Sequence, residues 1–263
     1  MIVFSIMEVI NFAHGEIFAI GAYIALIFTV NLKLPFFLSV LVSILLTGVI
    51  GIFLEKVLFK RIRTIPMNFV LATIGLSVVI QDIILLTMGG LPYSFPPIYE
   101  NIIKIGAFSI FEIRLLVMVI SAMCVIGLFI FLKYAKFGKA IRSTAQDEEG
   151  AIFSGVNVKK VYYASWFISF GFAALAGALI GQLFVVSGPY MGALPVQKAF
   201  AVIILGGLGS IPGTVVGGLV LGLTEALAIN FIPTGYSDVI AFLIIIIVLI
   251  LKPTGLFGEK KYA

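Results

Sequence analysis

Charge is scarce in this chain of 263 residues, because Asp, Glu, Lys and Arg together make up only 11% of it. Soluble domains carry about 25% charged residues and are roughly half apolar. Here 62% of the residues are hydrophobic and the mean hydropathy is +1.23, which excludes an ordinary soluble domain. We therefore predict an integral membrane protein in a lipid bilayer. We read the net charge of +5 as a signal of membrane topology and expect no nucleic-acid partner.

Cysteine and histidine are nearly absent, with one residue of each type. Cys124 alone cannot form an internal disulfide, so it gives no information on the compartment. His14 has no Cys or Asp nearby, and the chain lacks an H-E-x-x-H motif, so neither a metal site nor an intramembrane enzyme is favoured. The phosphate-binding motif G-x-x-x-x-G-K-[ST] is also missing. We expect no enzymatic activity and no bound cofactor or metal.

Long apolar runs fill most of the chain. Runs of about 20 apolar residues predict membrane-spanning helices, because open sheet edges cannot be satisfied in lipid. The predicted fold class is all-α, a polytopic bundle of about seven to eight spans in a single domain over 1–263, with broken, re-entrant helices among the spans. The expected spans are 17–32, 36–54, 67–88, 115–132, 162–186, 197–229 and 238–251.

Basic residues gather in 55–66, in 133–161 and after residue 251, and these segments hold most of the 17 Lys and Arg residues. Because cytoplasmic loops carry an excess of Lys and Arg, we expect all three segments in the cytoplasm. A single crossing by 197–229 would then put the C-terminal tail on the wrong side of the membrane. The run is also too long for one ordinary crossing.

The stretch "GGLGSIPG" (206–213) resolves this conflict, because Gly and Pro are unfavourable inside a helix. It predicts two helical pieces, about 197–206 and 213–229, that enter and leave on the outer side and meet at a membrane-embedded break. Transporters use such broken helices because the exposed helix ends bind ions and polar substrates. A Gly-rich packing helix is the alternative, and we expect both properties together.

The stretch "VINFAHGEIFAIGAY" (9–23) places polar groups at the start of an apolar span. A charge at the centre of a bilayer costs about 2.5–3.5 kcal/mol on insertion scales, so we expect these groups to face a cavity or protein partners. Asn11 is the expected N-cap of the following helix, which would carry Gly15 and Gly21 on its packing face. A purely structural hydrogen-bonding role for His14 stays open.

Several blocks resemble the permease subunits of branched-chain amino-acid ABC transporters, and most closely the shorter, H-type permease. These blocks are "INFAHGEIFAIGAYIA", "RSTAQDEEGAIFSGVNVKKV", "SGPYMGALPVQKAFAVIILGGLGSIPGTVVGGLVLGLTEAL" and "KPTGLFG". Such permeases usually have a further apolar segment before the first block, so we expect an N-terminal helix to be truncated here. The resemblance implies import of Leu, Ile or Val, with urea or another amide as the alternative substrate.

The resemblance also implies partners and a location. They are a second permease subunit, two cytoplasmic ATPase subunits that bind the ATP, and an extracytoplasmic substrate-binding protein. The expected location is the plasma (inner) membrane of a bacterium or archaeon, with several crossings and a cytoplasmic C-terminus. A passive channel or stand-alone carrier is a competing interpretation that would need no ATPase partner.

Permeases of this kind dock a short coupling helix on the ATPase, and loop 133–161 is the expected place for it. Residues 139–153 are compatible with a helix, which Gly155 would stop; an ordinary charged loop is the alternative. The expected coupling residues are Arg142, Gln146, Asp147, Gly150, Ala151, Ile152 and Gly155.

The substrate route is the least marked feature. A branched-chain amino acid has an apolar side chain and a zwitterionic end, so an apolar path with a few polar groups would suit it. Gln81, Asp82 and Glu225 are secondary candidates, and 102–113 predicts a short hairpin in the outer loop. The expected path residues are Asn11, His14, Gly15, Glu16, Gly207, Gly209, Ser210 and Pro212.

Overall fold

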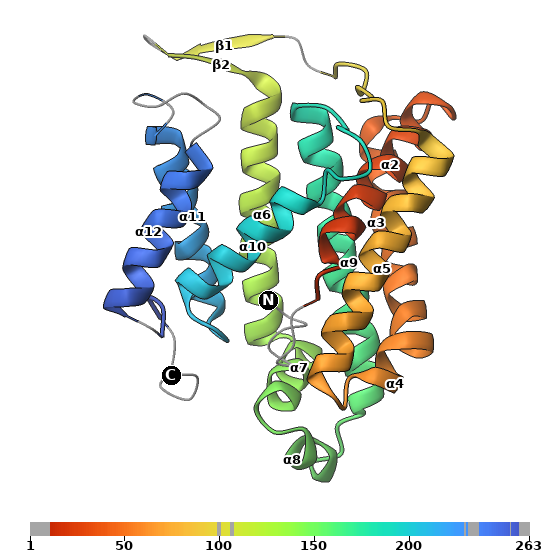
Figure 1. Ribbon diagram of the computed structural model, residues 1–263, viewed down its shortest axis with the longest axis vertical. Coiled ribbons are helices and arrows are strands. Elements are labelled where there is room, and N and C mark those ends of the chain that lie inside the picture. Colours follow the sequence, from red (N-terminus) through yellow and green to blue (C-terminus); the bar gives the residue numbers. More distant parts are fainter. Residues whose placement is uncertain are drawn as a thin grey trace. The chain divides into compact units, whose positions relative to one another are not determined.

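The computed structural model describes residues 11–98, 101–105, 108–228, 230, 237–252 and 254–257, and helices dominate this part of the chain (Figure 1). Within these described ranges, four helices are long and apolar enough to cross a membrane, and shorter apolar helices accompany them. The predicted all-α membrane bundle is therefore confirmed. The apolar helices are α2 (His14–Val30), α3 (Phe36–Leu54), α5 (Pro66–Met88), α6 (Glu112–Tyr134), α9 (Val158–Leu183), α10 (Ala193–Gly206), α11 (Ile211–Ala228) and α12 (Ser237–Leu251).

The chain divides into two compact units, with the boundary at Leu194 and Pro195. In the larger unit, α2, α3 and α9 form the core. Small residues permit the close approach: a Cβ on Gly21 would collide with Ala174, and one on Gly177 would collide with the Phe18 carbonyl. Helices in lipid associate through close packing at such small residues. The hydrophobic effect does not drive them together, because the lipid tails are as apolar as the helix surfaces. Gly21 thus lies on a packing face, as predicted.

The segment 55–66 is not a loop, which corrects the prediction for its first part. The helix α3 continues through a π-helical turn, η1 (Glu55–Phe59), and a short α4 (Lys60–Ile62). Lys and Arg are good helix formers, so a basic stretch can follow a span without ending the helix. The Arg63 guanidinium lies 3.7 Å from the centre of the Tyr162 ring. Two of the three basic segments therefore lie at one end of this unit.

The opposite end of the larger unit holds the predicted hairpin, formed by β1 (Ile102–Ile105) and β2 (Phe108–Phe111) (Figure 1). The strands are antiparallel, and Ile103 pairs with Ile110. The Pro-rich stretch before the hairpin packs against the helices, because Phe95 is buried with its ring 5.5 Å from that of Phe36. This loop thus covers the ends of the core helices.

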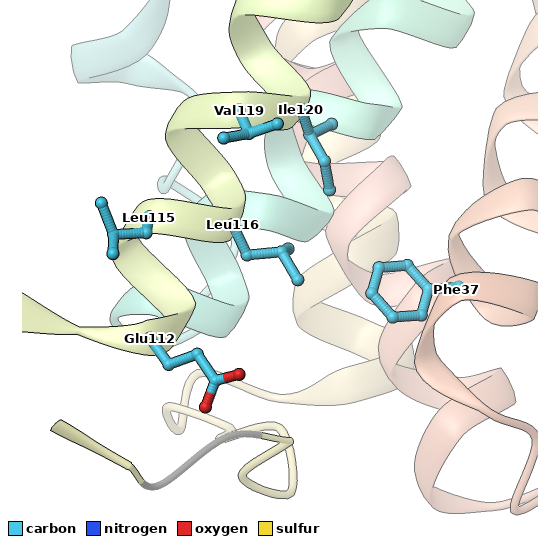
Figure 2. Close-up of a pocket in the computed structure, with 6 residues that line it drawn as sticks. All are labelled: Phe37, Glu112, Leu115, Leu116, Val119 and Ile120. Carbon is cyan, nitrogen blue, oxygen red and sulfur yellow. The ribbon is translucent and has the colours of Figure 1, made fainter. Parts of the chain in front are cut away.

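An apolar groove of about 430 Å³ lies between α3 and α6. In Figure 2, Leu116 of α6 points toward Phe37 of α3, and Glu112 stands at the start of α6. The remaining lining residues are Leu115, Val119 and Ile120. None of the expected path residues lines this groove. Its apolar walls fit the hydrocarbon of a bilayer.

The smaller unit contains α10, α11 and α12 and confirms the predicted helix break. The helix α10 ends at Gly206 and α11 begins at Ile211, within a few residues of the expected 197–206 and 213–229. Leu205, Leu221 and Ile245 form the buried core of these three helices. The predicted tail residues Lys260 and Lys261 lie outside the described residues.

Candidate functional site

Asn11 is buried just before α2, but it does not cap the helix as predicted. Its Oδ1 accepts a hydrogen bond from the Ala13 N–H at 3.1 Å, ahead of the first helical residue, His14. The cap position itself is Ala13, which offers no side-chain acceptor. The Asn11 side chain therefore forms a local turn that directs the chain into α2, a role that short polar side chains often take.

Glu16 shows how a carboxylate is accommodated in this apolar bundle. Its side chain is only 2% exposed, and its Oε1 accepts hydrogen bonds from Ser77 Oγ at 3.1 Å and Gln81 Nε2 at 2.7 Å. Both donors lie on α5, one turn apart. Hydrogen bonds of this kind offset part of the cost of removing a charged group from water. The other carboxylate oxygen, Oε2, has no hydrogen-bond partner among the described residues.

A polar stripe on α5 thus faces the start of α2. Thr73, Ser77 and Gln81 follow at intervals of four, which places them on one helix face, and Thr73 Oγ1 accepts from the Phe12 N–H at 3.3 Å. The sequence analysis named Gln81 as a secondary candidate but missed Thr73 and Ser77. Their spacing of four within an apolar span was the signal that could have revealed them.

His14 and Gly15, two other expected path residues, pack against other parts of the larger unit. The His14 ring is partly buried, and its centre lies 5.9 Å from that of Phe170 on α9. The Gly15 carbonyl lies against Gly192, where a Cβ on Gly192 would collide with it. Gly15 therefore packs against the segment that precedes α10.

The break between α10 and α11 is built from glycine and a capping serine. Gly207 and Gly209 have positive φ angles of 102° and 86°, which residues with a side chain rarely adopt. Ser210 Oγ accepts from the Gly213 N–H at 3.1 Å, the bond expected of an N-cap. Pro212 stands in the first turn of α11, where its missing N–H has no cost.

The two helices at the break approach to backbone contact. A Cβ on Gly206 would collide with Gly213, and a Cβ on Gly213 would collide with the Gly206 carbonyl. Further along α11, a Cβ on Gly217 would be 2.8 Å from the Val202 carbonyl oxygen. Both expectations for this stretch hold: the helix breaks, and its glycines pack closely.

Residues 255–257 of the C-terminal motif lie against the break, a contact that was not predicted from the sequence. The N–H groups of Leu256 and Phe257 donate to the carbonyls of Leu205 and Gly206 at 2.9 and 3.0 Å. These carbonyls belong to the last turn of α10, where they have no partner within the helix. Gly255, at φ 77°, lies so close that a Cβ would be 2.6 Å from the Ile204 carbonyl oxygen.

The predicted coupling loop forms two helices, α7 (Lys136–Gln146) and α8 (Glu148–Phe153), where the sequence analysis expected one over 139–153. Asp147 separates them with an extended backbone. Gly155, with φ 80°, ends α8 as predicted, because the Val156 N–H donates to the Ala151 carbonyl at 3.0 Å. The expected residues thus lie on α7, on α8 and on the residues that flank α8, at one end of the larger unit (Figure 1).

The expected coupling residues divide into exposed and buried ones. Ile152 is exposed, whereas Ala151 is 3% exposed and packs with Val158 and Tyr162, so the Ala151 side chain is not a surface contact. Phe153, which the sequence analysis missed, is 89% exposed. A large apolar pair in a charged loop, two residues before a helix-ending glycine, was the available signal. Arg142, Gln146 and Asp147 are exposed, and Gly150 lies beside the Asp147 carboxylate.

A bundle of apolar helices with a broken helix, a buried carboxylate and a short exposed helix beside a basic loop defines the class of membrane transport permeases. Within that class, the chain belongs to the permease component family of branched-chain amino acid transport systems, which matches residues 1–249.

Curated relatives agree with this family. The high-affinity branched-chain amino acid permease protein LivH of Escherichia coli K12 is 32% identical over 98% of this chain and 89% of its own length. BraD of Pseudomonas aeruginosa, a permease protein of the same description, is 31% identical with the same coverage. The probable LivH of Methanocaldococcus jannaschii is 26% identical over 94% of this chain and 82% of its own length. No solved structure matches the chain significantly.

Proposed function

We propose that this chain is the membrane-spanning permease subunit of an ATP-binding-cassette importer for the branched-chain amino acids leucine, isoleucine and valine. The observation that carries the proposal is the similarity over nearly the whole chain to permeases whose names give this substrate class. The same observation favours these amino acids over the alternative of urea or another amide. The permease forms one transmembrane domain over 1–263 in the plasma membrane of a bacterium or archaeon.

The partners of such an importer are a second permease subunit, two cytoplasmic ATPases and an extracytoplasmic binding protein. The ATPases bind and hydrolyse the ATP, since the chain carries no phosphate-binding motif. The exposed Ile152 and Phe153 on α8 support docking at this helix, because a large apolar side chain on a polar surface marks a contact site. Arg142, Gln146 and Asp147 would surround that contact with polar groups.

The substrate path is proposed to use the start of α2 and the break before α11. At α2, the open oxygen of Glu16 and the side chains of Asn11 and His14 provide polar groups in an apolar setting. At the break, Gly207 and Gly209 turn the chain between the end of α10 and the start of α11, and the dipoles of helix ends favour charged groups. A zwitterionic amino acid with an apolar side chain suits such a lining. The residues at the start of α2 and those at the break belong to different units, so each set is proposed separately.

The orientation follows from the charges. Segments 55–63 and 133–160 lie at one end of the larger unit, which we assign to the cytoplasm by the excess of Lys and Arg. In the smaller unit, the C-terminal residues 254–257 lie against the break. If the C-terminus is cytoplasmic, α10 enters from outside, turns near the inner face, and α11 returns.

Uptake into vesicles tests the function. Reconstituted with its own partner subunits and binding protein, the permease should accumulate labelled leucine, isoleucine and valine only when ATP is inside with the ATPases. Excess unlabelled isoleucine should compete with leucine uptake, and excess urea should not. Competition by urea alone would support the amide alternative, and uptake without any ATPase would identify a stand-alone carrier.

Cysteine labelling tests the orientation. In a Cys124→Ser background, we expect Gln146→Cys to react with an impermeant maleimide only from the cytoplasmic side. The matched variant Lys104→Cys, in the β1–β2 hairpin, should react only from outside, because both positions are exposed at opposite ends of one unit. Labelling of both cysteines from the same side would refute this orientation.

A further inference from the structure

A hydrogen bond connects the docking helix α8 to the membrane helix α9. The Tyr162 hydroxyl donates to Glu148 Oε2 at 3.0 Å. Glu148 is the first residue of α8 and is exposed, whereas the Tyr162 ring is buried in the first turns of α9. Ala151, one turn along α8, packs against the same tyrosine. Glu148 and Ala151 of α8 thus both contact the buried Tyr162 side chain.

The Tyr162 ring is in turn held by a partly buried ion pair. The Arg63 guanidinium stacks over this ring at 3.7 Å, and its Nη1 lies 2.7 Å from Glu55 Oε1. Glu55 is only 1% exposed and belongs to the π-helical turn η1 that continues α3. The Arg63 side chain is partly exposed, so the buried Glu55 is the member of the pair that would be left without a partner for its charge if the other were removed. Single π-helical turns occur frequently at functional positions of helices.

An aromatic stack continues from η1 toward the start of α2. Phe59, also in η1, stacks on Trp166 with ring centres 4.3 Å apart. Trp166 meets Phe170 edge to face at 5.3 Å, and Phe170 lies 5.9 Å from the His14 ring. Tyr162, Trp166 and Phe170 follow at intervals of four on one face of α9. Direct contacts therefore run from α8 to His14 within one compact unit.

We propose that Glu148, Tyr162, Arg63 and Glu55 are positioning residues that pass the movement of the docked α8 to α3 and, through the aromatic stack, to the start of α2. The proposal rests on the proposed function, because α8 moves only if an ATPase binds it. Tightly packed side chains, with an ion pair among them, transmit displacement well, since packed interiors do not deform continuously. The hydrogen bond from the Tyr162 hydroxyl to Glu148 joins α8 to this chain of contacts, beside the apolar contact of Ala151 with the same ring.

This link can be removed without disturbing the core. Tyr162→Phe keeps the ring under Arg63 and removes only the donor, and Glu148→Ala changes an exposed side chain. The measurement is the amount of leucine transported per ATP hydrolysed by the complete importer in vesicles. We expect each variant to lower this ratio by about three- to tenfold, the factor that corresponds to the loss of one typical hydrogen bond. The double variant should lose no more than either single variant, because both remove the same bond.

Glu149→Ala is the matched control. It removes the same charge from the neighbouring position of α8, where the Glu149 side chain is also exposed. This variant should keep the wild-type ratio. Glu148→Gln removes the charge but retains an acceptor for the Tyr162 hydroxyl, so it should keep most of the wild-type ratio. If the charge on α8 alone mattered, Glu148→Gln would lower the ratio as much as Glu148→Ala.

The outcomes separate this proposal from the proposed function. If the wild-type importer does not transport branched-chain amino acids, the proposed function is wrong. If the wild type transports leucine and Tyr162→Phe keeps the wild-type ratio, the positioning role is refuted. Additive losses in the double variant, or an equal loss in Glu149→Ala, would refute it as well. Arg63→Lys supplies an independent measurement: it keeps the charge for Glu55 but loses the planar stacking on Tyr162, so we expect a reduced ratio with normal membrane levels.

Discussion

The starts of α2 and α11 use polar residues in different ways. At α11, the Ser210 hydroxyl accepts from the backbone three residues ahead, so its polar group is satisfied locally. At α2, the Glu16 carboxylate is held by Ser77 and Gln81, which are 61 and 65 residues away in sequence. One of its oxygens is still without a partner in the described part of the chain.

This difference distinguishes a polar residue that the fold alone explains from one that the fold does not explain. A serine engaged as a helix cap is explained by the break alone, as in soluble proteins. A buried carboxylate held from one side is costly in a membrane, and ionisable residues at such positions generally mark the path of a substrate or ion. We therefore rank Glu16 above Ser210 as a path residue, and variants at the two helix starts should differ accordingly.

The largest effect is expected for Gly213→Val, at the break. The new side chain would collide with the Gly206 carbonyl, and two backbones cannot move apart without losing the whole contact between α10 and α11. Overpacking against backbone costs on the order of 3 kcal/mol or more. We expect almost no folded permease in the membrane and no uptake, measured by membrane levels and leucine transport.

Gly222→Val is the control for this variant. It lies on the same helix, and a Cβ there would meet no atom within 4 Å. Normal membrane levels of this variant would show that valine is tolerated in α11. If Gly213→Val also accumulated normally and transported leucine, this result would contradict the backbone contact between α10 and α11 at the break.

An intermediate effect is expected for Glu16. Glu16→Ala leaves the Ser77 hydroxyl and the Gln81 amide without their acceptor, which costs about 1–3 kcal/mol for buried polar groups. Glu16→Gln keeps an acceptor oxygen and should stay within about 1 kcal/mol of the wild type. Thermal unfolding of the purified protein in detergent measures both changes.

Uptake then separates structure from function at this position. We expect Glu16→Gln to fold normally but to transport little leucine, because the amide lacks the negative charge that would attract an ammonium group. Full uptake by Glu16→Gln would assign Glu16 a purely structural role and remove the contrast with Ser210.

The sequence was informative wherever the chemistry is local. Gly207, Gly209 and Pro212 predicted the break, because glycine and proline act on the backbone within a few residues. Gly155 predicted the end of α8 for the same reason, and apolar run lengths gave most helix bounds to within a few residues. The basic stretch 55–62 misled the prediction, because charge marks a side of the membrane rather than the end of a helix.

The sequence was silent wherever distant segments meet. The partners of Glu16 come from α5, and the contact at the break comes from Leu256 and Phe257, about fifty residues after the carbonyls they bind. The spacing of four on α5 marks a polar helix face, but neither pairing leaves a pattern in one sequence, because only the folded chain brings these groups together. The prediction that Asn11 caps α2 was wrong for a different reason. A short polar side chain can accept from any of several nearby N–H groups, and the backbone conformation decides which of them it binds.

The smallest effect is expected for Ser210→Ala. The loss of an N-cap costs about 1 kcal/mol, so the variant should unfold a few degrees lower and still transport leucine at a rate close to that of the wild type. Ser210→Asp restores a capping acceptor for the Gly213 N–H and should recover the thermal stability. If Ser210→Ala folds normally and yet loses uptake, and Ser210→Asp does not restore it, the hydroxyl serves the substrate as well as the helix. The two helix starts would then both contribute polar groups to the path, and a local cap would no longer exclude a transport role.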